Sequence, residues 1–156
     1  MSYEFNADEV FEIAEQIERN GAEFYRRAAE NIDEPENKKF LLDLAIMEDE
    51  HEQTFKQMRS ELTKNEKSMT TFDPEGESEV YLKSLADTRV FYEKDIDTTS
   101  LKEIFKSGIS AEKDSIVFYL GMKEVVPPHL GKDKLDVIIK EEMSHIKLLS
   151  KRLLEI

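Results

Sequence analysis

The sequence predicts an all-α protein in which four long helices form a bundle, with one long crossover between the second and third helices. Three observations favour this fold class. The 156 residues include only 5 glycines and 4 prolines, and 37% of them are charged. Apolar residues recur at spacings of three and four, as they do on one face of an amphipathic helix. The chain also repeats internally, because the same helix start and the same polar residues return 94 positions later.

The first two helices have clear start signals. Asn6 with Glu9 three residues later has the form of a capping box, so the first helix is expected over residues 6–29. The stretch from Asp33 to Pro35 then breaks the chain and places proline in the first turn of the second helix, where its missing N–H is tolerated. The second helix is expected to continue to about residue 64.

The last two helices repeat this arrangement. Ser100 with Glu103 matches the start of the first helix, so the third helix is expected over residues 100–124. Pro127 and Pro128 end it, because neither residue can continue a helix. The fourth helix is expected to begin near Asp133 and to continue to the C-terminus.

The stretch between the second and third helices has about 35 residues, which is too long for a hairpin in a compact bundle. It contains Asp73–Pro74 as a further helix start and an amphipathic piece over residues 80–86. A helix of about 29 residues is about 43 Å long, so a connection that returns along the bundle needs about this much chain. We therefore expect short connections within each helix pair and one long crossover between the pairs.

Composition excludes several classes of partner. The formal net charge of -13 would repel the phosphates of nucleic acids and anionic membranes, so neither is expected to bind. No apolar run approaches the roughly 20 residues of a membrane span, and the start of the chain has no signal-peptide pattern. The chain has no cysteine, which excludes disulfides and thiolate metal sites. We expect a single domain over residues 1–156, located in the cytoplasm.

The repeat brings together the polar residues that could hold metal. Four pairs coincide at the same offset: Glu18 with Glu112, Glu48 with Glu142, His51 with His145, and Tyr25 with Tyr119. Each half therefore contains a glutamate followed by a Glu-x-x-His motif, which is the ligand pattern of a two-metal carboxylate bundle. One Glu-x-x-His motif alone would be weak evidence in so acidic a chain, whereas two at matched positions favour a metal site.

Helical periodicity separates these residues from the other acids. With about 100° of rotation per residue, the four glutamates and two histidines of the pairs fall within the apolar stripes of their helices. Glu15 and Glu23 point away from the stripe of the first helix, so we expect them in solvent. Asp49 lies outside the stripe of the second helix and Glu52 at its margin, and we interpret both, with Glu50, as surface acids.

Buried carboxylates need a counter-charge. Four of them in an apolar core would repel one another, and each would cost several kcal/mol to desolvate unless paired. No lysine or arginine lies in the stripes at the same level. Two divalent cations would balance four glutamates, and shared carboxylates can hold two ions about 3.5–4 Å apart. The predicted metal ligands are Glu18, Glu48, His51, Glu112, Glu142 and His145.

Other side chains are expected to support this site. A ligand histidine usually donates its other ring nitrogen to an acceptor, and Glu141 is the candidate acceptor for His51. The repeat aligns Glu141 with Met47, so the two metals need not be equivalent. The two matched tyrosines are expected to hydrogen-bond carboxylates across the bundle or to supply an electron. His129 has no counterpart in the repeat and is expected to be a surface loop residue.

At these positions the sequence resembles the rubrerythrin branch of the ferritin-like superfamily. The resemblance covers most of the chain and rests on residues 18–25, 48–51, 112–119 and 142–145. It implies a ferritin-like left-handed four-helix bundle with two iron ions, which cycle between ferrous and ferric while oxygen or peroxide is reduced. It also implies a homodimer. Iron is favoured by the resemblance alone, because carboxylate and imidazole also accept manganese or zinc.

The chain departs from the family pattern in three respects. Full-length rubrerythrins add a rubredoxin-like domain with four cysteine ligands, whereas this chain has no cysteine, so an external electron donor is expected. Rubrerythrins tend to carry a further glutamate three positions after the ligand of the third helix, and here that residue is Ser115. This substitution argues against peroxide reduction. No short fifth helix of the kind used in storage shells is expected after the fourth helix, which disfavours mineral storage.

Three functions remain open. The first is a rubrerythrin-like oxidoreductase, in which each Glu-x-x-His motif binds one metal while Glu18 and Glu112 act as terminal or bridging carboxylates. The second is an iron-binding or iron-handling protein whose metal is cargo. The third is a metal-free helical interaction module, which is disfavoured because an empty site would leave acids buried.

Overall fold

The structure is a computed structural model that describes residues 7–64, 80–82, 84–85, 100–130 and 132–156. Its elements are α1 (Ala7–Glu30), α2 (Pro35–Ser60), α5 (Leu101–Met122), the short 3-10 helix η1 (Pro128–Leu130) and α6 (Lys132–Leu154). These described ranges contain no β-strand, and none of their helices is both long and apolar enough to cross a membrane. The predicted all-α class is confirmed.

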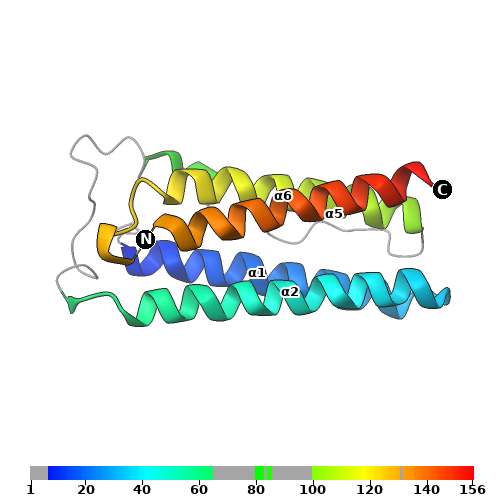
Figure 1. The fold of residues 1–156 in the computed structure, drawn as a ribbon, viewed down its shortest axis with the longest axis horizontal. Coiled ribbons are helices and arrows are strands. Elements are labelled where there is room, and N and C mark those ends of the chain that lie inside the picture. The colour runs from blue at the N-terminus through cyan, green and yellow to red at the C-terminus, as the bar shows by residue number, and fades with distance from the viewer. Residues whose placement is uncertain (1–6, 65–79, 83, 86–99, 131) are drawn as a thin grey trace.

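The helices form two antiparallel pairs. α1 packs along α2, and α5 packs along α6 (Figure 1). α2 ends at the left of this view whereas α5 begins at the right, so these two helices run in the same direction (Figure 1). The chain must therefore return along the bundle between them, as the predicted crossover requires. Most of the crossover, including Asp73–Pro74, lies outside the described residues.

The described part of the crossover packs on α5. Residues 80–82 and 84–85 are helical and fall within the amphipathic piece predicted over residues 80–86. Leu82 is completely buried, and the Tyr81 hydroxyl donates a hydrogen bond of 3.2 Å to the carbonyl oxygen of Val117. Gly121 permits this approach, because a Cβ atom there would lie 2.7 Å from the Tyr81 ring.

The helix starts follow the predicted signals where they are described. Pro35 lies in the first turn of α2, and the Glu34 side chain accepts hydrogen bonds from two backbone N–H groups of that turn. The Ser100 side chain accepts from the N–H of Glu103 over 3.4 Å. The matching start at Asn6 lies outside the described residues.

The end of α2 differs from the prediction. The helix ends at Ser60, whereas the apolar pattern predicted a continuation to about residue 64. The N–H of Leu62 bonds to the carbonyl oxygen of Arg59 over 3.2 Å, which tightens the last turn. This turn places Leu62 in the core, where only 6% of its surface is exposed.

The interior of the bundle consists of two apolar clusters. One contains Phe11, Phe55 and Tyr119, and the other contains Tyr25 and Phe105. Each of the four long helices contributes to both clusters. On each of these helices the predicted ligand residues come between its residues of the first cluster and those of the second. A polar layer therefore crosses the middle of an otherwise apolar core.

Glu15 does not point into solvent, so its predicted exposure is wrong. It is 5% exposed, and Nη1 of Arg59 lies 2.8 Å from its carboxylate. The same guanidinium donates to Asp8 through Nε over 2.8 Å. Glu15 therefore lies in the contact between α1 and α2, where a cation of the neighbouring helix compensates its burial.

Glu52 is also buried, so its interpretation as a surface acid is wrong. It is 7% exposed, and its carboxylate pairs with Arg19 over 2.8 Å and with Lys56 over 3.1 Å. Glu23, Glu50 and His129 are exposed as expected. Glu15 and Glu52 thus have lysine or arginine partners, whereas within the described residues the acids of the polar layer have none.

Removing the Arg59 cation should destabilise the fold. We expect Arg59→Met to lower the free energy of unfolding by about 1–3 kcal/mol, because Glu15 would remain buried without a hydrogen-bonded partner. Equilibrium urea unfolding measures the loss. The double variant Arg59→Met/Glu15→Gln should recover part of it, and equal stability of Arg59→Met and the wild type would contradict this description of the α1–α2 contact.

Candidate metal centre

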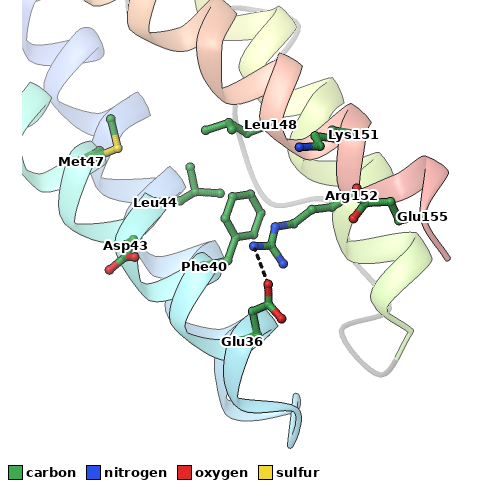
Figure 2. Close-up of a pocket in the computed structure, with 9 residues that line it drawn as sticks. All are labelled: Glu36, Phe40, Asp43, Leu44, Met47, Leu148, Lys151, Arg152 and Glu155. Carbon is green, nitrogen blue, oxygen red and sulfur yellow. Dashed lines mark ion pairs between the residues drawn. The ribbon is translucent and has the colours of Figure 1, made fainter.

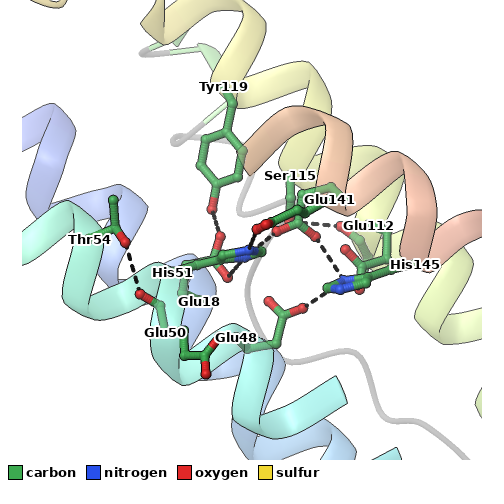
Figure 3. A network of polar contacts seen from close by, with 12 residues as sticks. Glu18, Glu48, Glu50, His51, Thr54, Glu112, Ser115, Tyr119, Glu141 and His145 are labelled. Atoms are coloured by element: carbon green, nitrogen blue, oxygen red, sulfur yellow. Dashed lines mark hydrogen bonds and ion pairs between the residues drawn. The ribbon is translucent and has the colours of Figure 1, made fainter. Parts of the chain in front are cut away.

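The six predicted ligand side chains come together at one level of the bundle. α1 contributes Glu18, α5 contributes Glu112, and α2 and α6 each contribute the two residues of a Glu-x-x-His motif. None of the six is more than 5% exposed. Most of them appear in Figure 3, where their side chains converge between the helices. The spacing of three within each motif places glutamate and histidine on the same helix face.

These side chains form two overlapping groups. Their potential ligand atoms lie within 4.8 Å of one another in each group. Both groups contain Glu48 and Glu142. The first group adds Glu18 and His51, and the second adds Glu112 and His145. The side chains thus form two adjacent candidate metal sites that share two carboxylates.

Each histidine directs its Nδ1 atom toward the carboxylates. Nδ1 of His51 lies 2.7 Å from Glu142 and 3.4 Å from Glu18. Nδ1 of His145 lies 3.3 Å from Glu48, 3.4 Å from Glu112 and 3.5 Å from Glu142. Neither Nδ1 atom has hydrogen-bond geometry to a partner among the described residues. Both nitrogens are therefore placed as metal ligands would be, with carboxylate oxygens beside them.

The buried carboxylates perturb each other electrostatically. Burial, together with the charges of Glu112, Glu142 and Glu18, raises the pKa of the Glu48 carboxyl well above its ordinary value. Burial and the charges of Glu18 and Glu112 likewise raise the pKa of Glu142. Burial acts in the same sense on Glu112, but its contacts with Glu142 and His145 outweigh that effect and lower its pKa. Ionised Glu48 and Glu142 thus require a nearby positive charge.

The histidines take up that positive charge in the metal-free protein. Burial opposes protonation of His51, but the carboxylates of Glu142 and Glu18 raise its pKa to about 11. Burial also opposes protonation of His145, while Glu112 and Glu142 raise its pKa to about 9. A histidine must be neutral to bind a metal ion, whereas both histidines are protonated without metal. Metal binding and proton release are therefore coupled.

The layer contains polar atoms that the protein itself leaves without partners. Among the described residues, Oε2 of Glu18, Oε1 of Glu48 and both carboxylate oxygens of Glu142 are buried without a hydrogen bond. Buried polar atoms without partners are rare, because each costs about 1–3 kcal/mol. Carboxylate oxygens and imidazole nitrogens are donors that iron, manganese and zinc accept. The residues present therefore fit a pair of divalent metal ions.

The two tyrosines link the halves of the repeat crosswise. The Tyr25 hydroxyl of α1 donates to Oε1 of Glu112 over 2.6 Å, and the Tyr119 hydroxyl of α5 donates to Oε1 of Glu18 over 2.5 Å. The predicted hydrogen bonds across the bundle are therefore present. Burial, with the adjacent carboxylates, raises the pKa of both tyrosines well above the ordinary value, so both hydroxyls keep their protons.

Glu141 makes the contact that was predicted for it. Its Oε2 atom lies 2.6 Å from Nε2 of His51, and 44% of its side-chain surface is exposed. In contrast, Nε2 of His145 has no hydrogen-bond partner among the described residues. Ser115 does not join the site through its hydroxyl, which donates to the carbonyl oxygen of Ala111.

Gly21 contributes to the site and was assigned no role from the sequence. A Cβ atom at this position would lie 3.0 Å from Oε2 of Glu48, so the missing side chain makes room for that carboxylate. Glycine within a helix costs about 1 kcal/mol relative to alanine, and Gly21 lies one turn after Glu18. Its position in the helix was a signal that could have identified it.

A separate pocket lies at the seam of α2 and α6, nearer the C-terminus. Figure 2 shows Phe40, Leu44, Met47 and Leu148 on its walls and Arg152 beside them. Its volume is about 410 Å³. None of the six predicted ligands lines it, so the candidate metal centre is a packed layer of side chains and not part of this pocket.

The fold and the buried Glu/His groups together define a ferritin-like carboxylate bundle. The Rubrerythrin family model matches residues 9–153, and the chain belongs to this family. A crystal structure of a Thermotoga maritima protein assigned as a ferritin-like diiron-carboxylate protein has the same fold, with a TM-score of 0.72 and 24% sequence identity. The match covers 99% of each chain and confirms the predicted ferritin-like left-handed four-helix bundle. No curated protein matches the chain.

The metal-free protein should lose stability as the pH rises. His51 and His145 have a higher pKa in the folded state than their ordinary value of about 6.5. Their contribution to the free energy of unfolding is therefore fully present below about pH 6.5. It is lost as the pH rises through about 9 and then about 11. The raised pKa values of Glu48 and Glu142 act in the same direction, because the folded state again binds more protons.

Urea unfolding in the presence of a chelator, from about pH 7 to about pH 10, tests this dependence. The His145→Gln variant should lose the part of the slope near the lower of the two histidine pKa values. A free energy of unfolding that stays constant or increases over this range in the wild type would show that the layer does not hold these protons.

Proposed function

We propose that this chain is a di-iron carboxylate oxidoreductase of the rubrerythrin type, which reduces peroxide or oxygen, or oxidises ferrous iron. One observation carries the proposal: two buried donor groups share Glu48 and Glu142, and several of their oxygen and nitrogen atoms have no partner among the described residues. Two divalent ions would balance the charge of four glutamates in this layer. Iron is favoured over manganese and zinc by the family to which the chain belongs.

The geometry suggests a role for each ligand. Glu48 and Glu142 would be available to hold either ion, because they belong to both groups. His51 with Glu18 would complete one site, and His145 with Glu112 would complete the other. The sequence had left Glu18 and Glu112 as terminal or bridging carboxylates, and their membership of one group each favours the terminal role.

The surrounding side chains would orient these ligands and manage protons. A bound di-iron centre would supply two electrons to peroxide or oxygen. Tyr25 and Tyr119 hold one oxygen each of Glu112 and Glu18, which limits the rotation of those carboxylates. The half-exposed Glu141 accepts a hydrogen bond from Nε2–H of His51 and so connects a buried histidine with solvent. The apolar clusters on both sides of the layer exclude water from it.

The electrons must come from a separate molecule under this proposal. The chain has no cysteine, so it contains no rubredoxin-type four-cysteine iron site. We therefore propose an external electron donor, with oxygen or peroxide as oxidant. A homodimer follows from the family resemblance only.

Oxidation of bound ferrous iron tests the activity. We expect peroxide or oxygen, added to the anaerobic ferrous protein, to oxidise iron at least about 100-fold faster than in the double variant Glu48→Ala/Glu142→Ala, since changes beside metal ligands alone cost up to this factor. The matched control is Glu23→Ala/Glu50→Ala, which removes two exposed acids and should react like the wild type. Equal rates in the wild type and in the Glu48→Ala/Glu142→Ala variant would refute the proposal.

Metal content distinguishes the competing functions. We expect two divalent ions per chain to remain after desalting and to raise the melting temperature, because a ligand at 100 times its Kd stabilises by about 2.7 kcal/mol. Elemental analysis and thermal unfolding with and without chelator measure both effects. Many weakly held ions per chain would instead favour iron handling. No bound ion, with an unchanged melting temperature, would favour a metal-free interaction module.

A further inference from the structure

The two halves of the site differ in the partner of the second histidine nitrogen. The repeat matches all six ligands, but it aligns Glu141 with Met47. A carboxylate accepts hydrogen bonds strongly, whereas a thioether is a weak acceptor. The asymmetry is therefore already present in the sequence. The residue before the glutamate of the Glu-x-x-His motif is an acid in α6 and an apolar residue in α2.

The contacts of the two imidazoles follow this difference. His51 donates its Nε2–H to Glu141 over 2.6 Å, so the nitrogen that faces the carboxylates is Nδ1, which would offer its lone pair to a metal once its own proton is released. Figure 3 shows Glu141 reaching His51 from α6. His145 is completely buried, and its Nε2 atom has no hydrogen-bond partner among the described residues. Among the described residues, no hydrogen bond to the outer nitrogen therefore fixes the orientation of the second ring.

A hydrogen bond on the outer nitrogen prepares a histidine for a metal. It fixes the tautomer and the ring orientation, and loss of such a partner typically weakens metal binding about 10–100-fold. His51 has this hydrogen bond, whereas no described residue provides one for Nε2 of His145. The two sites thus differ before any ion binds, although their ligands are of the same types.

We infer that the two metal sites are unequal and that Glu141 is the positioning residue responsible. The site formed by Glu18, Glu48, His51 and Glu142 binds the first divalent ion. The site that contains Glu112 and His145 binds the second ion more weakly. The inference rests on the proposed di-metal function and adds the order in which its sites fill.

Two substitutions make the halves alike in opposite ways. Glu141→Met gives both histidines a methionine at the matched position, and Met47→Glu gives both a glutamate. Anaerobic titration with cobalt(II), followed by its absorption bands and by chelator competition, measures both binding steps. Two neighbouring ions bind in unequal steps in any case, because the first ion repels the second. The role of Glu141 is therefore tested by comparing the variants with the wild type.

We expect Glu141→Met to weaken the first binding step about 10–100-fold, and Met47→Glu to strengthen the second. Glu50→Met is the matched control, since it removes an exposed acid of α2 whose carboxylate is not among the ion-pair partners of His51. It should leave both steps unchanged. Circular dichroism of each variant checks that the helices remain intact.

A second comparison separates positioning from a general effect of charge. In a His51→Ala background, Glu141→Met should no longer weaken cobalt(II) binding, whereas in a His145→Ala background the loss should persist. Equal losses in both backgrounds would overturn the inference. Identical titrations of Glu141→Met and Glu50→Met, with two ions bound by the wild type, would also overturn the inference. That result would not contradict the proposed di-metal function. A wild type that binds no cobalt(II) would defeat both.

Discussion

The structure depends on how the negative charge in the middle of the bundle is balanced. Four glutamates and two histidines, none more than 5% exposed, lie between two apolar clusters. The basic residues paired with Glu15 and Glu52 lie at the margins of the helix pair and do not reach this layer. The negative charge of the layer must therefore be neutralised by bound protons or by metal cations. The raised pKa values of His51, His145, Glu48 and Glu142 show that the layer binds protons more tightly than these groups do in water.

The repeat explains why the layer is so regular. Each half supplies the same ligand types at the same spacing, and each tyrosine binds the carboxylate of the other half. The crossed hydrogen bonds connect α1 with α5 and hence one helix pair with the other. The same residues that define the candidate site thus also fix how the two halves pack. One departure from this symmetry, Glu141 against Met47, lies beside the histidines.

Much of the fold and of the site could be predicted from the sequence, because helical periodicity and the internal repeat are visible along the chain without knowledge of how the helices pack. Those signals placed Glu18, Glu48 and His51 inward, and the adjacency of Glu141 to Glu142 identified its contact with His51. They could not reveal Glu15 and Glu52, because burial there depends on where Arg59 and Arg19 lie across a helix contact. A glycine within a helix marked Gly21 as unusual, but the room that it leaves for Glu48 depends on the approach of α1 and α2.

Under the proposed function, divalent cations provide the missing positive charge in this layer. Anomalous diffraction at the iron edge, from crystals of protein prepared anaerobically with ferrous iron, tests it most directly. We expect two anomalous peaks between the helices, with Glu48 and Glu142 beside both and one histidine beside each. A layer without anomalous signal at full iron loading, with its acids turned outward or paired with basic side chains, would contradict it.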